Sequence, residues 1–261
     1  MMLYSPLLPI LALAVLLQLG LWLWATRTRN AGWVDVGWSG GMALAAPVLL
    51  FFSERDARDL LVFGLMAFWA CRLCVHLLGD RLLGGKAEDA RYQDLRRHWG
   101  DQASLKFFFF FQGQALLVPL FALPAWAVMS STLSFPSVFD VLGLALGLGA
   151  IGGESMADAQ LARFRADPAN KGKVCRNGLW RFSRHPNYFF EWLHWCAYAV
   201  WAIGAAAWPL TLLGPVLMYL FLRYLTGIPH TERRSLASRG DAYREYQSTT
   251  NMFWPWIPRK H

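Results

Sequence analysis

The stretch GLWRFSRHPNYFFE, residues 178–191, runs without a break into the apolar segment WLHWCAYAVWAIGAAA, residues 192–207. The first stretch brings these charged and polar side chains close together in the sequence: Arg181, Arg184, His185, Asn187, Tyr188 and Glu191. Charge at this density beside an apolar segment is costly unless it is solvated or binds a polar ligand. We therefore expect a polar, anionic ligand where a membrane helix meets water.

Apolar runs recur along the whole chain and predict a polytopic membrane protein. Of the 261 residues, 56% are hydrophobic and 16% are charged, whereas soluble domains are less apolar and more charged. Seven segments are long enough to cross a bilayer, at about 4–26, 32–52, 59–79, 107–130, 136–153, 189–207 and 208–227. The spans must be helical because lipid offers no hydrogen-bond partner to open strand edges. The sequence predicts an all-α fold and one integral-membrane domain over residues 1–261.

Basic residues alternate between rich and poor loops. Residues 80–106 carry six Lys and Arg, residues 154–188 carry seven, and the tail after residue 227 carries six, whereas residues 131–135 carry none. With seven spans the rich segments share one side, which predicts an outside N-terminus and a cytoplasmic C-terminus. The net charge of +8 could suggest a nucleic-acid partner. The basic residues lie in short loops between apolar runs, however, which is typical of a membrane protein, so we expect no nucleic-acid partner.

Neither the N-terminus nor the cysteines predict processing or a metal site. Residues 1–26 lack a basic first region and a small-residue cleavage site, so they predict a retained helix rather than a signal peptide. Cys71 and Cys74 form a CxxC pair, but no second pair and no HxxxH follows. Zinc needs further ligands, so we interpret the four cysteines as buried apolar residues and expect no metal.

The polar residues after the fifth span are typical of a nucleotide site. Glu154, Asp158 and Arg165 share one broad face at helical spacing, and Arg163 lies close by. A carboxylate can bind an amide and arginines can bind phosphates, although the same set also suits a solvated, salt-bridged helix end. The following cluster of Lys171, Lys173 and Arg176 fits either a 2′-phosphate or pyrophosphate, or anionic lipid headgroups.

His185 and Pro186 predict the first turn of a helix. Free backbone N–H groups at such a start suit a phosphate or carboxylate. Asn187, Tyr188 and Glu191 follow within the next turns, where Glu191 is either a functional carboxylate or a partner of a nearby arginine. Further along the chain, His230 and Glu232 directly follow the last span and are expected at the same interface.

Tyr92 and Asp35 are candidate proton donors on the evidence of their sequence neighbours. Tyr92 lies close in sequence to carboxylates and a guanidinium, so its phenol could protonate a carbonyl or enolate, or it could brace the loop. Asp35 is the only acidic residue of the second predicted span and could donate a proton or contact a ligand.

Five motifs follow one another along the chain: Asp35-Val-Gly-Trp38, Glu88-Asp-Ala-Arg-Tyr92, the stretch 177–188 with Glu191, Gly227-Ile-Pro-His-Thr-Glu232 and Tyr243-Arg-Glu-Tyr246. Their order resembles the membrane steroid 5α-reductase superfamily, and most closely its bacterial branch with a steroid-reductase-type C-terminal domain. The resemblance implies a seven-helix protein of a bacterial inner membrane that binds NADPH on the cytoplasmic side. It also implies reduction of a C=C bond conjugated to a ketone, in a hydrophobic lipid or steroid-like substrate that enters from the bilayer.

The resemblance also assigns roles to positions. It implies cofactor contacts at Asp158, Arg165, Asn187, Glu191 and His230, with Arg163, Arg184, His185, Tyr188 and Glu232 beside them. Residues 1–106 are expected to form the substrate side and residues 107–261 the NADPH-binding half. The Gln-Glu pair and the Tyr with which steroid reductases hold the ketone have no counterpart here. The proton donor stays open among Asp35, His76 and Tyr92, and so does the oligomeric state.

A second family also resembles this chain. Isoprenylcysteine carboxyl methyltransferases share an Arg-His-Pro-x-Tyr motif, a Pro-x-x-Glu step and a late Tyr-x-x-Tyr. That resemblance implies that Arg184, His185, Tyr188 and Glu232 hold S-adenosylmethionine. Asn187, Glu191 and the upstream set from Glu154 to Arg165 favour the reductase. A lipid-binding protein without enzymatic activity is the third alternative, and it predicts no nucleotide binding.

Overall fold

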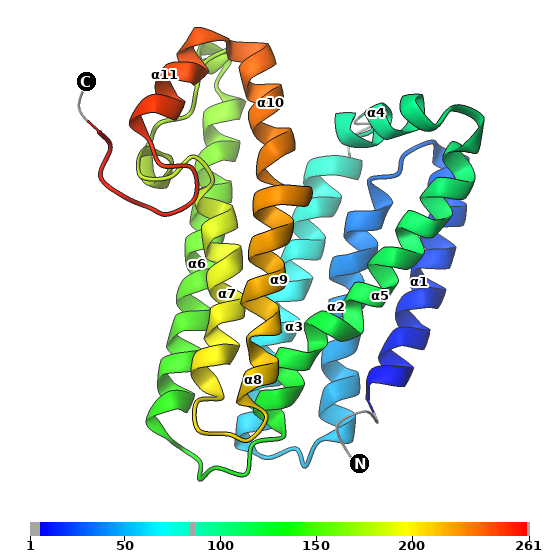
Figure 1. Cartoon of the computed structure of the whole chain (residues 1–261), viewed down its shortest axis with the longest axis vertical. Coiled ribbons are helices and arrows are strands. Elements are labelled where there is room, and N and C mark those ends of the chain that lie inside the picture. The colour runs from blue at the N-terminus through cyan, green and yellow to red at the C-terminus, as the bar shows by residue number, and fades with distance from the viewer. Residues whose placement is uncertain (1–5, 84–86, 260–261) are drawn as a thin grey trace. The chain divides into compact units, whose positions relative to one another are not determined.

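The computed structural model describes residues 6–83 and 87–259, and these residues contain helices and irregular segments but no β-strand (Figure 1). Six helical segments are long and apolar enough to cross a membrane: Leu7–Thr28, Trp33–Phe52, Ala57–Asp80, Ala90–Met129, Val138–Ala166 and Trp208–Arg239. The chain is therefore an all-α, multi-pass integral membrane protein, as predicted. It divides into two compact units, each of which is described separately.

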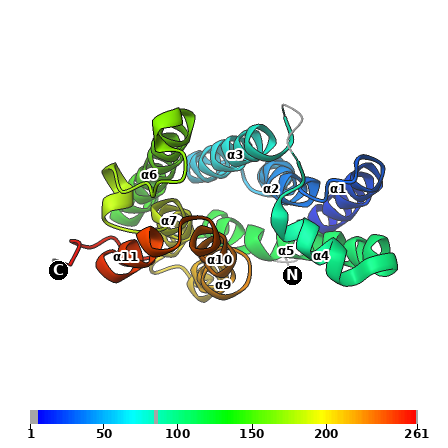
Figure 2. The same cartoon turned by 90° about the horizontal axis from the view of Figure 1, so that it is seen from above.

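Unit 1 comprises the chain up to Asp140 together with Ala202–Leu213. Helices α1 (Leu7–Thr28), α2 (Trp33–Phe52) and α5 (Ala103–Met129) pack on one another, and α3 (Ala57–Leu77) packs on α2 and α5 (Figure 2). The π-helical turn η1 (Leu78–Leu82) extends α3, and α4 (Ala90–Trp99) and η2 (Gly100–Gln102) lead into α5. The short α8 (Trp208–Thr211) also packs on α5. Helix α5 thus belongs to unit 1, although the sequence assigned residues from 107 onward to the second half.

A buried ion pair fixes one end of unit 1. The Nε atom of Arg58 lies 2.7 Å from Oδ1 of Asp140, and each side chain is 3% exposed. The same guanidinium donates to the carbonyl oxygens of Ser131, Leu133 and Ser134 at 3.0–3.2 Å. Because every polar direction of the guanidinium is used, this arginine ties the loop after α5 to α3.

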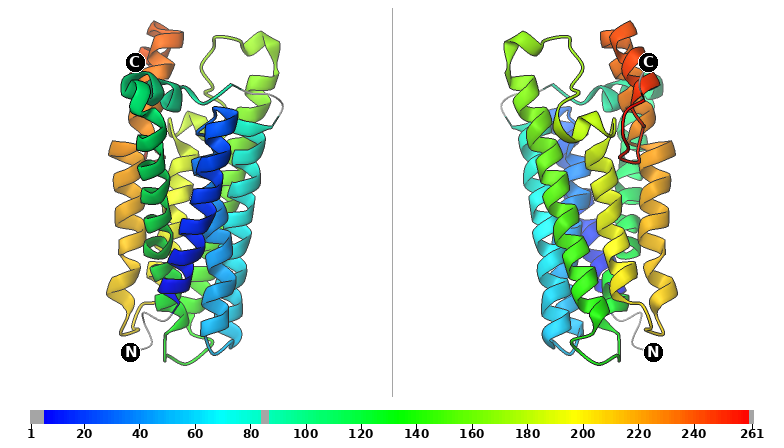
Figure 3. Two further views of the ribbon diagram at one scale, coloured as in Figure 1. Left: turned by 90° about the vertical axis from the view of Figure 1, so that its right-hand side faces the viewer. Right: turned by 90° about the vertical axis from the view of Figure 1, so that its left-hand side faces the viewer.

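Unit 2 comprises Val141–Trp201 and Gly214–His261. Its long helices are α6 (Val138–Ala166), which begins three residues before the unit, and α7 (Pro186–Trp201), and these lie side by side (Figure 3). Helix α9 (Leu213–Leu220) continues through the π-helical turn η5 (Phe221–Leu225) toward α10 (Ile228–Arg239) and α11 (Asp241–Thr249). The loop between α6 and α7 contains two short 3-10 turns, η3 (Pro168–Asn170) and η4 (Gly178–Arg181).

Glycines permit the close approach of α6 and α7. A Cβ atom on Gly143 would lie 2.8 Å from the Cα atom of Trp201, and one on Gly153 would lie 2.3 Å from the ring of Phe190. Real side chains do not tolerate such distances, so a residue with a Cβ atom would push these helices apart. Small residues commonly permit membrane helices to approach one another in this way.

The boundaries of the sixth predicted span, 189–207, were wrong. Helix α7 begins at Pro186 and ends at Trp201, so its 16 residues rise only about 24 Å, and it is not among the six segments. The predicted span 189–207 contains a turn instead, in which Gly204 has a φ of 89° that ordinary residues rarely adopt. Helix α6 continues to Ala166, beyond the predicted end at residue 153. The orientation in the membrane stays a prediction.

Candidate functional site

All ten residues predicted to bind the cofactor belong to unit 2: Asp158, Arg163, Arg165, Arg184, His185, Asn187, Tyr188, Glu191, His230 and Glu232. They come from the end of α6, the start of α7, the loop between these helices and the first turns of α10. Residues separated by up to 74 positions in the sequence therefore lie on one compact unit, as the nucleotide hypothesis requires.

The loop before α7 is folded back against α6. The indole Nε1 of Trp180 donates to the carbonyl oxygen of Ala157 at 2.9 Å, and the backbone N–H of Leu179 donates to Oε1 of Gln160 at 2.9 Å. Gly178 has a φ of 58°, and a Cβ atom there would lie 2.5 Å from the Gln160 side chain. Glycine is thus needed at this position both for its backbone conformation and for its lack of a side chain.

A network centred on Glu232 joins the start of α7 to α10 and α11. Its Oε1 accepts a hydrogen bond from Arg184 Nε at 2.6 Å and lies 3.3 Å from His185 Nε2. Gln247 Nε2 donates to Oε2 at 2.7 Å, and the Tyr243 hydroxyl donates to Oε1 at 3.4 Å. The network therefore uses both carboxylate oxygens. Gln247 and the contact of Tyr243 with this site could not be predicted from the sequence, because nothing local in the sequence links α11 to Glu232.

Arg184 and Tyr246 connect the same region to the C-terminal segment. Arg184 Nη1 donates to the carbonyl oxygens of Gln247 at 3.0 Å and Thr250 at 2.6 Å. The buried Tyr246 hydroxyl donates to the carbonyl oxygens of Trp180 and, at 3.2 Å, Ser183. These bonds hold the backbone that leads into α7, so the late Tyr-x-x-Tyr motif has a clear structural function.

Burial shifts the pKa values of two groups of the network, His185 and Tyr243. Burial lowers the pKa of His185, while the Glu232 carboxylate opposes this shift and the Arg184 guanidinium adds to it. Burial also raises the pKa of Tyr243 to about 12, and the negative charge of Glu232 acts in the same direction. At neutral pH the phenol therefore keeps its proton and acts as a donor.

Asn187 joins the start of α7 to α6. Its Nδ2 donates to Oδ1 of Asp158 at 3.2 Å. A carboxylate only accepts hydrogen bonds, so this contact fixes which end of the amide faces Asp158. Within residues 6–83 and 87–259, the buried Oδ1 of Asn187 has no hydrogen-bond partner. An acceptor is thus held in place beside α6 without a donor from the described part of the chain.

The other predicted cofactor residues differ in exposure. Glu191 is 7% exposed and accepts a hydrogen bond from Trp195 Nε1 at 3.2 Å. The ring of Tyr188 stacks on His185, with centroids 5.4 Å apart, and also packs against Gly227 at the start of α10, the helix that carries His230. Arg163 and Arg165 lie at the end of α6 with exposed side chains.

The three candidate proton donors lie in unit 1. Arg91 Nη2 lies 3.2 Å from Oδ2 of Asp35, and the same guanidinium lies 5.2 Å from the ring centroid of Tyr92. Tyr92 is 3% exposed and its ring packs against Phe107, which matches the bracing interpretation. His76 has an exposed side chain in the last turn of α3. The structure thus brings two of the three candidates together through Arg91.

No three His, Cys, Asp or Glu side chains of the described residues meet as metal ligands. The site in unit 2 instead offers fixed amide, carboxylate and guanidinium groups at helix ends, on a multi-pass membrane protein.

Comparison with known families supplies the class of this protein. Residues 21–250 match the family described as "Protein of unknown function (DUF1295)". The match covers most of the chain, so the protein belongs to this family of steroid 5α-reductase-like proteins. No curated protein and no solved structure matches the chain.

Proposed function

We propose that this protein is a membrane-embedded, NADPH-dependent reductase of a C=C bond conjugated to a ketone in a lipid or steroid-like molecule. When bound, NADPH supplies a hydride to the β-carbon of the enone. The reaction is completed by a proton at the α-carbon, so that the C=C bond is lost and NADP⁺ is released.

The Asp158–Asn187 pair is the observation that carries the proposal. A buried amide oxygen without a donor costs on the order of 1–3 kcal/mol, and natural proteins rarely leave such a group unsatisfied without a reason. The Oδ1 of Asn187 is such an oxygen among the described residues. The carboxamide of a nicotinamide ring has an NH2 group that fits this acceptor. The residues present therefore suit the cofactor.

Other residues of unit 2 have supporting roles in this proposal. Arg163 and Arg165 are exposed at the end of α6, where guanidinium groups can bind phosphate oxygens. Arg184 and Glu232 contact each other and hold the start of α7 in position. Glu191 and His230 complete the set of polar groups on α7 and α10 that the reductase resemblance assigns to the cofactor.

The proton donor is a separate part of the proposal. Tyr92, Asp35 and His76 are the candidates, and the substitutions Tyr92→Phe, Asp35→Asn and His76→Gln each remove one proton donor. The true donor is the residue whose loss lowers the rate of reduction while NADPH affinity stays at the wild-type value.

One observation bears on the methyltransferase alternative. Arg184, His185 and Glu232 form one network with Tyr188 stacked beside it, and these are the residues that would hold S-adenosylmethionine. The Glu232 carboxylate already receives protein donors at both oxygens. Its Oε2 therefore has one acceptor position left for the ammonium group of that cofactor, which disfavours this alternative.

Ligand-induced stabilisation tests the proposal. The detergent-purified protein is heated with NADPH, NADH or S-adenosylmethionine, and a ligand at 100 times its dissociation constant stabilises the fold by about 2.7 kcal/mol. We expect a response to NADPH that is lost in Asn187→Ala and Glu191→Gln. Gln102→Ala removes an exposed amide and is the matched control that keeps the response. Stabilisation by S-adenosylmethionine alone would eliminate the reductase.

A further inference from the structure

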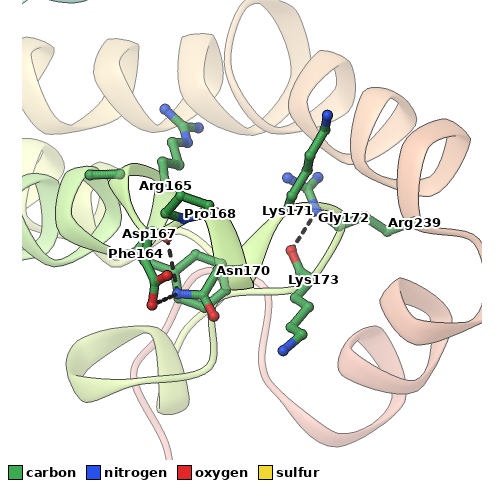
Figure 4. A pocket seen from close by; sticks show the side chains of 10 residues that line it. Phe164, Arg165, Asp167, Pro168, Asn170, Lys171, Gly172, Lys173 and Arg239 are labelled. Atoms are coloured by element: carbon green, nitrogen blue, oxygen red, sulfur yellow. Dashed lines mark hydrogen bonds between the residues drawn. The ribbon is translucent and has the colours of Figure 1, made fainter.

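The loop that follows α6 forms a hollow in unit 2 with a volume of about 280 Å³ (Figure 4). Its lining residues include four basic ones, Arg165, Lys171, Lys173 and Arg239, and only one acid, Asp167. Arg165 and Lys171 extend to the same side of the loop in Figure 4, whereas the Lys173 side chain points away from them. Arg239 comes from the end of α10, so the hollow is built by tertiary structure.

The acidic residue does not neutralise these cations. Asp167 accepts hydrogen bonds from the backbone N–H of Ala169 at 2.9 Å and from Asn170 Nδ2 at 3.4 Å. Its carboxylate therefore closes the turn of the loop. Arg239 is held in place by a hydrogen bond from its Nε to the Lys173 carbonyl oxygen at 2.9 Å.

The basic residues of the hollow have no acidic partner among the residues that the structure describes. In the part of the chain that the structure describes, none of these four side chains forms an ion pair. Cations that share one hollow repel each other, and an anion between them removes this cost. The hollow therefore has the charge of an anion site before any ligand binds.

We propose that this hollow binds a phosphate ester. Guanidinium and ammonium groups are the usual partners of phosphate oxygens in proteins. The volume is close to the lower limit of about 300 Å³ for sites of small organic ligands. It therefore has room for a phosphorylated group such as a ribose phosphate or a lipid headgroup.

Two sources of the phosphate are compatible with the position of the hollow. Arg165 follows Asp158 by seven residues, which places it on the same face of α6 at about 10 Å. A 2′-phosphate of a dinucleotide bound at Asp158 is the first source, and it rests on the proposed function. An anionic lipid headgroup at the end of a membrane helix is the second, and it is independent of that function.

The experiment compares wild type, the double variant Lys171→Gln/Arg239→Gln and the control Arg234→Gln. The control also removes a cation from an exposed position of α10, outside the hollow. Binding of adenosine 2′,5′-bisphosphate and of adenosine 5′-diphosphate is measured by calorimetry in neutral detergent. Binding of phosphatidic acid and phosphatidylcholine is measured by native mass spectrometry.

We expect wild type to prefer one phosphate monoester, either the 2′,5′-bisphosphate or phosphatidic acid, over its comparison ligand. The double variant should bind that ligand at least about tenfold more weakly, as expected for the loss of a hydrogen bond to a charged group, and the control should bind it normally. Binding of neither ligand, or equal binding by the double variant, overturns the proposal. If the double variant binds NADPH as wild type does, the hollow does not bind the cofactor, and the proposed reductase function is unaffected. If wild type binds phosphatidic acid in the hollow but binds no nucleotide, the phosphate-ester site is supported and the proposed reductase function is overturned.

Discussion

The substitution Glu232→Ala tests whether the network at the start of α7 holds unit 2 together. It removes a carboxylate that accepts bonds from Arg184 at 2.6 Å and Gln247 at 2.7 Å. Loss of one partner of a buried ion pair costs about 3–5 kcal/mol. The Glu232 side chain is 15% exposed, and Arg184 keeps its bonds to two backbone carbonyl oxygens. We therefore expect the lower end, about 3 kcal/mol.

For a chain of this length, a loss of about 3 kcal/mol corresponds to a fall in Tm of about 6–12 °C. The assay is thermal unfolding in detergent, followed by tryptophan fluorescence. Glu245→Gln is the matched control, because Glu245 also pairs with an arginine but is 54% exposed, and exposed pairs contribute only about 0–1 kcal/mol. If Glu232→Ala melts within about 2 °C of wild type, the network does not have the stabilising role described here.

Three further predictions concern the fold of unit 2. Gly143→Ala should lower Tm by several degrees, because its Cβ atom would lie 2.8 Å from the Trp201 backbone. Gly149→Ala is the control and should leave Tm unchanged, because no atom lies within 4 Å of its Cβ position. Equal melting temperatures of the two variants would contradict the close approach of α6 and α7. Gly178→Ala should lower the free energy of unfolding by about 1–2 kcal/mol, since φ is 58° at this position. Chemical unfolding measures this change, and a denaturation midpoint equal to that of wild type would refute the prediction. Burial lowers the pKa of His185, so the unfolded chain binds more protons below about pH 6.5. Stability should therefore be complete above that pH and decrease below it, and His185→Gln should flatten this dependence; a parallel loss in both proteins would count against it.

The long helices could be predicted from the sequence because lipid and water impose simple rules on composition. Five of the seven predicted spans lie on α1, α2, α3, α5 and α6. The end of α7 could not be located in this way, because residues 202–207 are as apolar as the helix before them. Only the turn at Gly204, with a φ of 89°, ends the helix early, and glycine is also common inside membrane helices.

The candidate site could be predicted in part. Asp158 and Asn187 were both chosen from the sequence, and they form a hydrogen bond between α6 and α7. The contact of Gln247 with Glu232 and the place of Arg239 beside Lys173 could not be foreseen. Both depend on how α10 and α11 return to the loop before α7, and no local pattern of residues encodes that path.

Direct binding of NADPH to the purified protein tests the central claim most closely. Equilibrium dialysis is performed with wild type, Asn187→Ala and Gln102→Ala, with S-adenosylmethionine as a competitor. The account predicts saturable binding of one NADPH per chain in wild type and Gln102→Ala, no displacement by S-adenosylmethionine, and loss of binding in Asn187→Ala. Wild-type protein that binds no NADPH, or an Asn187→Ala variant that binds it with unchanged affinity, would contradict the account.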